Sequence, residues 1–149
     1  MLRATRWRGH FGGACLAFVA CDGGDDDATE APACAVPPAS DCAPLYTPSF
    51  DEVYARTLVP GCATGGGSCH GSATASGGGF YIDDADSTFA RLLQDRGEGS
   101  LVVAGDPSCS SLVVRLVIDD PVLGMPPGAP LAAGELCSVT RWIEEGATR

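Results

Sequence analysis

Residues 62–70 read Cys-Ala-Thr-Gly-Gly-Gly-Ser-Cys-His and place two thiols and one imidazole in a single glycine-rich loop. A Cys-His pair with a second cysteine upstream is the core of the signal for covalent haem attachment, whose usual form is Cys-x-x-Cys-His. In that chemistry the thiols form thioethers with the porphyrin vinyl groups, and the adjacent histidine binds the iron. Cys62, Cys69 and His70 are therefore the first residues to which the sequence assigns a chemical role.

The spacing of the two cysteines departs from the usual signal, because six residues separate them instead of two. The three glycines at 65–67 allow the loop to bulge outward between the attachment points, since glycine adopts backbone angles that other residues avoid. A small disulfide between Cys62 and Cys69 uses the same two thiols, and the sequence leaves both alternatives open. Zinc held by Cys62, Cys69 and His70 is disfavoured because the usual ligand spacings and a fourth ligand are absent.

Charge and cysteine content limit the class of protein. The chain has 149 residues, which suits one domain with additional segments, and its formal net charge is −10 with nine arginines and no lysine. This excess of negative charge argues against nucleic acid and against anionic membrane surfaces as partners. Eight cysteines indicate an oxidising compartment, a metal or a cofactor.

Residues 1–21 are typical of an export signal. Three arginines among the first eight residues precede an apolar stretch over residues 11–20, which is too short to span a bilayer. The stretch ends in Val-Ala-Cys, which resembles a bacterial lipobox and predicts lipidation of Cys21. Lipid chains hold a protein at a membrane without a spanning helix. We therefore expect a lipid-anchored protein in the periplasm or at the outer membrane surface, with ordinary secretion as the alternative.

Residues 22–48 are predicted to be a disordered linker. They are rich in Asp, Ala and Pro and lack the periodicity of a helix or a strand, and their prolines disfavour regular structure. Cys34 and Cys42 lie eight positions apart in this segment, and we expect them to pair as a local disulfide. The folded domain is expected over residues 49–149.

Residues 49–149 predict a mainly α domain, a bundle of about four short helices with long Gly- and Pro-rich loops. Ser49 and Glu52 form a capping box at the start of the first helix. Pro60 and Gly61 are expected to end this helix directly before the Cys-His loop. The other helices are expected over residues 84–94, from residue 107 to about 116, and over residues 133–145.

Two further cysteines, Cys109 and Cys137, fall near the starts of the last two predicted helices. We expect them to form a disulfide that joins these helices, which would stabilise the domain by roughly 2–4 kcal/mol. Cys62 and Cys69 then remain for haem or for each other.

From Phe50 to Ala147 the chain resembles the small cytochrome c-like domains of planctomycete and myxobacterial exported proteins. The resemblance implies a class I cytochrome c fold around one covalently held haem. It rests on the order and spacing of Cys69-His70, of residues 78–83 and 105–113, of Met125-Pro-Pro-Gly and of residues 141–147.

Carried over from this resemblance, Cys62 and Cys69 are the thioether residues, His70 is the proximal iron ligand and Met125 is the distal ligand. Methionine and histidine together hold haem iron and raise its reduction potential. Met125 lies between a glycine and two prolines, outside any helical stripe, so a stiff backbone would hold its sulfur. The alternative for Met125 is an ordinary side chain that fills the core.

The expected function is that of a membrane-tethered electron carrier with haem c as its cofactor and a redox partner protein. The alternative is a haem-free, disulfide-stapled domain of the same shape that acts as a binding or structural module of the cell envelope. An enzyme is not expected. With His70 as the one histidine beyond the export signal, no Ser-His-Asp triad is available, and without lysine no phosphate-binding loop of the Gly-x-x-x-x-Gly-Lys type exists.

Overall fold

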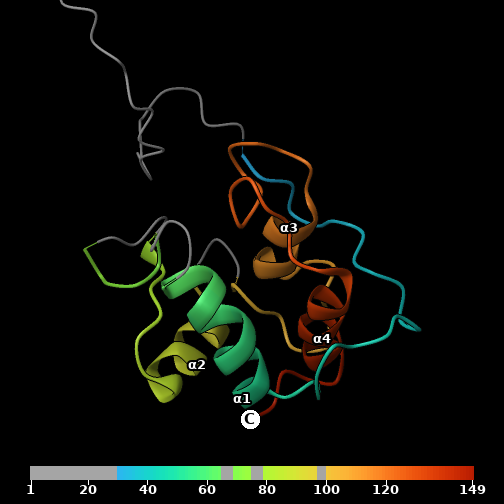
Figure 1. Cartoon of the computed structure of the whole chain (residues 1–149), viewed down its shortest axis with the longest axis horizontal. Helices are drawn as coiled ribbons and strands as arrows, with labels where there is room; N and C mark the ends of the chain where they lie inside the picture. Colours follow the sequence, from blue (N-terminus) through green and yellow to red (C-terminus); the bar gives the residue numbers. More distant parts are fainter. Residues whose placement is uncertain (1–29, 65–68, 75–78, 97–99) are drawn as a thin grey trace, which may run out of the picture.

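The computed structural model describes residues 30–64, 69–74, 79–96 and 100–149 (Figure 1). In these residues it contains helices and no strand, so the prediction of a mainly α domain is confirmed. Because α1 continues directly into η1, the described chain has four helical segments, the number that the sequence predicts. The elements are α1 (Phe50–Val53), η1 (Tyr54–Ala63), α2 (Ala85–Leu93), α3 (Ser111–Val117) and α4 (Ala133–Glu144).

Two helices begin at the caps that the sequence predicts. The hydroxyl of Ser49 accepts a hydrogen bond from the backbone N–H of Glu52 at 3.4 Å and caps α1. The carboxylate of Asp84 accepts one from the backbone N–H of Ser87 at 2.9 Å and caps α2. This bond to an N–H group stabilises the charged form, so it lowers the pKa of Asp84.

The first helix does not end at Pro60, so that part of the prediction is wrong. η1 is a π-helix that passes through Pro60 and ends at Ala63, and the N–H of Thr64 donates to the Val59 carbonyl five residues earlier, at 2.9 Å. Proline is excluded from an α-helix because it lacks an N–H and crowds the carbonyl four residues back. The wider π-turn changes which carbonyl faces the ring. Cys62 therefore lies in the last turn of η1.

The third helix begins later than the sequence predicts, at Ser111 instead of Pro107. The carboxylate of Asp106 explains the delay, because it accepts hydrogen bonds from the Ser108 hydroxyl at 2.5 Å and from the Cys109 N–H at 3.2 Å. These two bonds hold the chain in a turn and lower the pKa of Asp106. Cys109 consequently lies in the turn before α3 and not on the helix.

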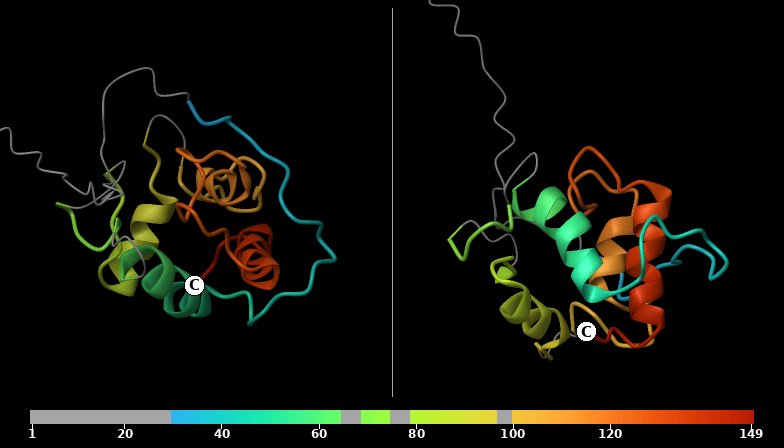
Figure 2. Two further views of the ribbon diagram at one scale, coloured as in Figure 1. Left: turned by 45° about the horizontal axis from the view of Figure 1, so that its top comes forward. Right: turned by 60° about the horizontal axis from the view of Figure 1, so that its bottom comes forward.

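Residues 34–48, here called the strap, run along the outer side of α3 and α4 before the chain enters α1 (Figures 1 and 2). Disulfides join Cys34 to Cys109 and Cys42 to Cys137, with Cα–Cα distances of 4.2 and 6.0 Å. The predicted pairs Cys34–Cys42 and Cys109–Cys137 are therefore wrong, although all four cysteines are disulfide-bonded. The reason is that the two strap cysteines face different elements, the turn before α3 and the helix α4.

Hydrogen bonds also attach the strap to the domain. The N–H of Ala35 donates to the Ser108 carbonyl at 2.9 Å, and the N–H of Leu45 donates to the Gly134 carbonyl at 2.8 Å. The side chain of Tyr46 is buried in the core. The prediction of a disordered linker is thus wrong for residues 34–48, and residues 22–29 lie outside the described part of the chain.

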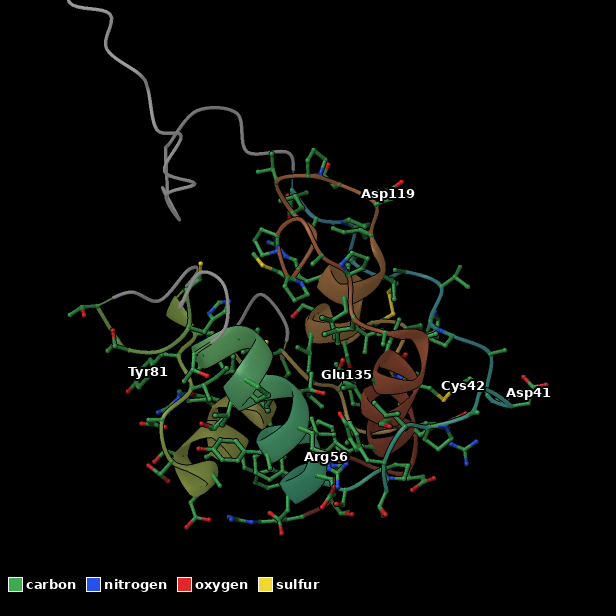
Figure 3. The ribbon with its side chains drawn as sticks, viewed as in Figure 1. Asp41, Cys42, Arg56, Tyr81, Asp119 and Glu135 are labelled. Atoms are coloured by element: carbon green, nitrogen blue, oxygen red, sulfur yellow. A yellow bond between two sulfur atoms is a disulfide. The ribbon has the colours of Figure 1, made fainter. Side chains whose placement is uncertain are left out.

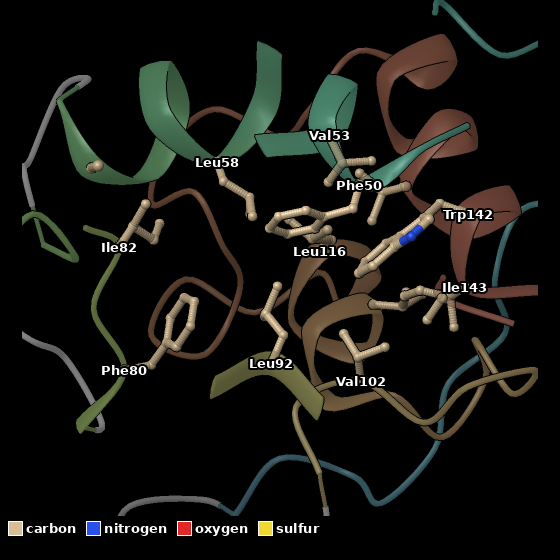
Figure 4. Close-up of a cluster of buried hydrophobic side chains, with 14 of the residues drawn as sticks. Phe50, Val53, Leu58, Phe80, Ile82, Leu92, Val102, Leu116, Trp142 and Ile143 are labelled. Atoms are coloured by element: carbon tan, nitrogen blue, oxygen red, sulfur yellow. The ribbon is translucent and has the colours of Figure 1, made fainter. Parts of the chain in front are cut away.

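The apolar core lies between the four helical segments and is centred on Phe50 (Figure 4). The Phe50 ring lies 4.8 Å from that of Phe89 on α2 and 5.7 Å from that of Trp142 on α4, measured between ring centroids. α3 contacts α4 and contributes Leu116 to the same cluster. At the C-terminus, Arg149 pairs with Asp51 at 3.9 Å and also with Asp86, so it connects the end of the chain to α1 and α2.

Within the described ranges, no helix combines the length and the apolar character needed to cross a membrane.

Candidate functional site

His70 is held between the end of η1 and residues 80–82 by three hydrogen bonds. Its backbone N–H donates to the Cys62 carbonyl at 3.2 Å, and its own carbonyl accepts from the N–H of Ile82 at 2.7 Å. Its side-chain Nδ1 lies 2.8 Å from the carbonyl oxygen of Phe80. The backbone and the imidazole of His70 are therefore both fixed in place.

The bond to Phe80 determines which nitrogen of His70 carries the proton. A carbonyl oxygen only accepts hydrogen bonds, so Nδ1 must donate and Nε2 of the neutral ring keeps its lone pair. Metal-binding histidines commonly donate their second nitrogen to a backbone carbonyl in this way, which orients the ring and makes the ligand more basic. The donor chemistry of His70 thus fits an iron ligand that binds through Nε2.

The first cysteine remains next to the histidine in spite of the widened spacing. The hydrogen bond from the His70 N–H to the Cys62 carbonyl closes the loop, although eight positions separate the two residues. The predicted outward bulge falls on residues 65–68, which lie outside the described residues. The extra residues therefore do not separate the two ends of the motif.

Cys62 is a free thiol whose surroundings keep it protonated. Its Sγ lies 3.9 Å from the Thr57 carbonyl oxygen, to which it donates. Burial, and to a lesser extent the negative charge of Glu135, raises the pKa of the Cys62 thiol to about 11. Since the thiolate is the nucleophile, Cys62 is weakly reactive at neutral pH in the folded chain.

Cys69 is disulfide-bonded, but not to Cys62, whose thiol is free. The small disulfide across the loop, one of the two alternatives from the sequence, is thus not formed in this structure. A sulfur atom in a disulfide cannot also form a thioether with a vinyl group. Attachment of haem through Cys69 requires that disulfide to be reduced.

Glu135 is a further candidate site residue, which no pattern in the sequence indicates. It lies on the inner side of α4 facing η1 (Figure 3), where its Oε1 accepts a hydrogen bond from the Thr57 hydroxyl at 2.8 Å. The hydroxyl of Tyr46, from the strap, is in turn 2.5 Å from that of Thr57. Residues from three separate segments form this network, so only the tertiary structure brings them to Cys62.

Met125 lies in a loop that is fastened to α3. Its N–H donates to the Arg115 carbonyl at 2.7 Å, and the N–H of Gly124 donates to the Asp120 carbonyl at 2.8 Å. A Cβ at Gly124 would lie 2.7 Å from that carbonyl oxygen, so only glycine fits this approach. The side chain of Met125 packs against the core cluster, which also contains Phe80. The structure therefore brings Met125 and the residue that orients His70 to one apolar cluster.

Among the described residues, no group of three or more His, Cys, Asp or Glu side chains is arranged to hold a metal ion. The zinc alternative therefore finds no ligand set in this part of the chain.

Residues 67–128 match the family model described as Planctomycete cytochrome C. The matched segment contains Cys69, His70 and Met125 and leaves out Cys62, η1 and α4. Together with the helical fold, the match confirms the predicted resemblance to a cytochrome c-like domain of planctomycete proteins. No curated protein and no solved structure shows significant similarity to the chain.

Proposed function

We propose that this protein is a c-type cytochrome-like electron carrier in which His70 and Met125 bind the haem iron. The observation that carries the proposal is the bond between Nδ1 of His70 and the Phe80 carbonyl, which keeps Nε2 available for a metal. His70 also falls within the segment that matches a cytochrome c family model. Haem supplies the redox couple when it is bound, and its iron cycles between two oxidation states.

Each proposed site residue has a distinct task. His70 would present a ring nitrogen of fixed orientation, and the Met125 thioether would favour ferrous iron. Cys62 and Cys69 would hold the porphyrin through thioethers, which requires both sulfurs as free thiols before attachment. Because Cys62 is partly buried and its pKa is about 11 in the folded chain, we expect attachment to precede the packing of η1. The apolar cluster that contains Phe80, with Met125 packed against it, would limit the access of water to the two proposed iron ligands.

The proposed location follows from the export signal and from Cys21, which lie outside the described residues. A lipid on Cys21 would hold the domain at the periplasmic or outer surface of a membrane without a spanning helix. Electrons would pass to and from a redox partner protein, and the chain itself would catalyse no substrate reaction. A formal net charge of −10 favours a partner with a basic docking surface and disfavours nucleic acid.

A second function is favoured by the disulfides. Cys34–Cys109 and Cys42–Cys137 close long loops, and Cys69 is also disulfide-bonded. Small exported domains with this many cross-links fold without a cofactor. In this alternative the chain is a haem-free binding or structural module of the cell envelope.

Expression in a host that matures c-type cytochromes tests the ligand pair. The wild type should contain haem, His70→Ala should lose most of it, and Met125→Leu should retain it, because leucine preserves the volume of methionine but not its sulfur. Carbon monoxide should bind more readily to Met125→Leu, and its reduction potential should be lower than that of the wild type. A colourless wild-type protein from such a host would favour the disulfide-stapled module.

A further inference from the structure

We propose that Arg91, on α2, is a positioning residue for His70. Arg91 forms hydrogen bonds to Tyr81 and Asp83 in the segment 80–83. The Phe80 carbonyl in the same segment is the group that orients the imidazole of His70. The consequence for iron binding rests on the proposed function, whereas the effect on the imidazole of His70 does not.

Arg91 contacts the segment at two residues. Its guanidinium carbon lies 3.9 Å from the centre of the Tyr81 ring, and its Nε donates to the Tyr81 carbonyl at 3.2 Å. Its Nη2 donates to the carboxylate of Asp83. The Arg91 side chain is 17% exposed and that of Asp83 is 41% exposed, so the guanidinium is better shielded from solvent than the carboxylate that it contacts. Only arginine combines stacking on a ring with donors in a planar fork.

Buried and more exposed residues alternate along residues 80–83, and His70 and Arg91 contact different members of this alternation. Phe80 and Ile82 are 8% and 3% exposed and belong to the core, whereas Tyr81 and Asp83 are more exposed. His70 uses the first pair, through the Phe80 carbonyl and the Ile82 N–H. Arg91 uses the second pair. His70 therefore contacts the two buried residues of this segment, and Arg91 contacts the two more exposed ones.

Apart from the burial of Phe80 and Ile82 and the bonds to His70 and Arg91, the remaining hydrogen bonds that the described residues make to the segment act on Asp83 only. The hydroxyl of the buried Thr88 accepts from the Asp83 N–H at 3.2 Å, and the Tyr54 hydroxyl donates to the Asp83 carbonyl. Arg91 in addition holds Tyr81, which directly follows the carbonyl that His70 uses. Loss of Arg91 should therefore leave Asp83 attached but allow the Phe80 carbonyl to move away from Nδ1.

Nitrogen NMR on the full-length, haem-free chain tests this inference, because it reports the tautomer of each imidazole. His10 is the one other histidine, so His10→Ala assigns the two signals. In the wild type, neutral His70 should carry its proton on Nδ1. Arg91→Met keeps the aliphatic stem but no donor, and His70 should then shift towards the Nε2-protonated form that a free imidazole prefers. Hydrogen exchange of the Ile82 N–H with solvent should become roughly tenfold faster, which is the size of effect expected when one hydrogen bond is lost.

Arg56→Met is the matched control. Arg56 also pairs with a carboxylate, Glu52 at 2.5 Å, and lies 5.7 Å from the centre of an aromatic ring, that of Tyr46, but it makes these contacts away from residues 80–83. This variant should leave the tautomer of His70 and the exchange of Ile82 unchanged. Arg91→Lys keeps a positive charge beside Asp83 without the planar fork, so it should give a partial shift.

Two results would overturn the inference: a fully Nδ1-protonated His70 in Arg91→Met, or the same tautomer shift in the Arg56→Met control. If Arg91→Met does not fold, an unchanged tautomer in Arg91→Lys is the decisive negative result. In protein that takes up haem, Arg91→Met should also change the reduction potential. Failure of the wild type to take up haem would count against the proposed function and would leave the NMR result intact.

Discussion

At the scale of single residues, Cys62 shows how its surroundings control a thiol. Its pKa rises from 9.0 to about 11, mainly through burial and secondly through Glu135. The folded chain therefore binds this proton more tightly than the unfolded chain does. The resulting stabilisation is complete below the unfolded pKa and is lost as the pH rises through the folded pKa.

This shift predicts a pH dependence that belongs to Cys62 in the haem-free chain. A pKa difference of about 2 corresponds to at most about 2.7 kcal/mol, and partial exposure makes about 2 kcal/mol a better expectation. The free energy of unfolding of the wild type relative to Cys62→Ala should fall by this amount between about pH 8 and pH 11. Urea titrations of both proteins measure it, and the subtraction removes the contribution of Tyr46. A difference that is independent of pH would contradict the assignment.

The candidate site residues that carry a motif are visible in the sequence, whereas groups that act through the backbone are not. Cys69-His70 and the Gly-Met-Pro-Pro-Gly loop around Met125 are visible as patterns. The Phe80 carbonyl has no side-chain signature, so no pattern predicts its contact with His70. Glu135 approaches Cys62 only because α4 packs beside η1.

At the scale of elements, the strap converts a predicted linker into part of the fold. Its disulfides close separations of 75 and 95 residues, and the Tyr46 side chain is buried in the core. Cross-links over such long separations reduce the entropy of the unfolded chain most strongly. Cys137 lies in the second turn of α4, so its disulfide attaches this helix to the strap.

Removal of one cross-link should lower stability without preventing folding. The double variant Cys42→Ser/Cys137→Ser should lose about 2–4 kcal/mol of unfolding free energy, measured by urea titration. Cys34→Ser/Cys42→Ser is the matched comparison, because it removes one partner from each disulfide and should lose more. Non-reduced peptide mapping of the wild type should find Cys34 linked to Cys109. Recovery of Cys34 linked to Cys42 would refute this arrangement of the strap.

The helices that the sequence predicted correctly have a local signal at one end at least. α2 begins beside the Asp84 cap, and α4 begins at Ala133 and ends before Gly146, whose φ of +101° suits glycine. The errors at η1 and α3 have local causes that depend on geometry. A π-turn accommodates Pro60, and Asp106 caps a turn in place of a helix.

At the scale of the whole molecule, the account predicts an acidic domain tethered to a membrane by lipid alone. Cys21→Ser should release the protein from membranes or block its processing, because the acceptor of the lipid is lost. Cys15→Ser lies in the same predicted signal and should leave membrane association unchanged. Fractionation and the mass of the mature N-terminus measure both outcomes. Membrane association of Cys21→Ser equal to that of the wild type would contradict the lipid anchor.

The family match and the structure contribute different parts of this account. The match covers residues 67–128, which contain Cys69, His70 and Met125. The strap, η1 and α4 lie outside it. They contribute Cys34, which pairs with Cys109, the whole of the Cys42–Cys137 disulfide, and the residues Cys62 and Glu135. The proposed attachment of haem through Cys62 therefore rests on parts of the chain that the family match does not include.

Mass spectrometry of the peptide that carries Cys62, Cys69 and His70 tests the proposed haem attachment. Because the chain has no lysine, trypsin releases residues 57–91, between Arg56 and Arg91, with Cys62, Cys69 and His70 together. From cells shown to mature other c-type cytochromes, the account predicts this peptide with a covalent haem adduct. A peptide without haem, in which Cys62 is a free thiol and Cys69 is disulfide-bonded, would contradict the electron carrier and leave the disulfide-stapled module.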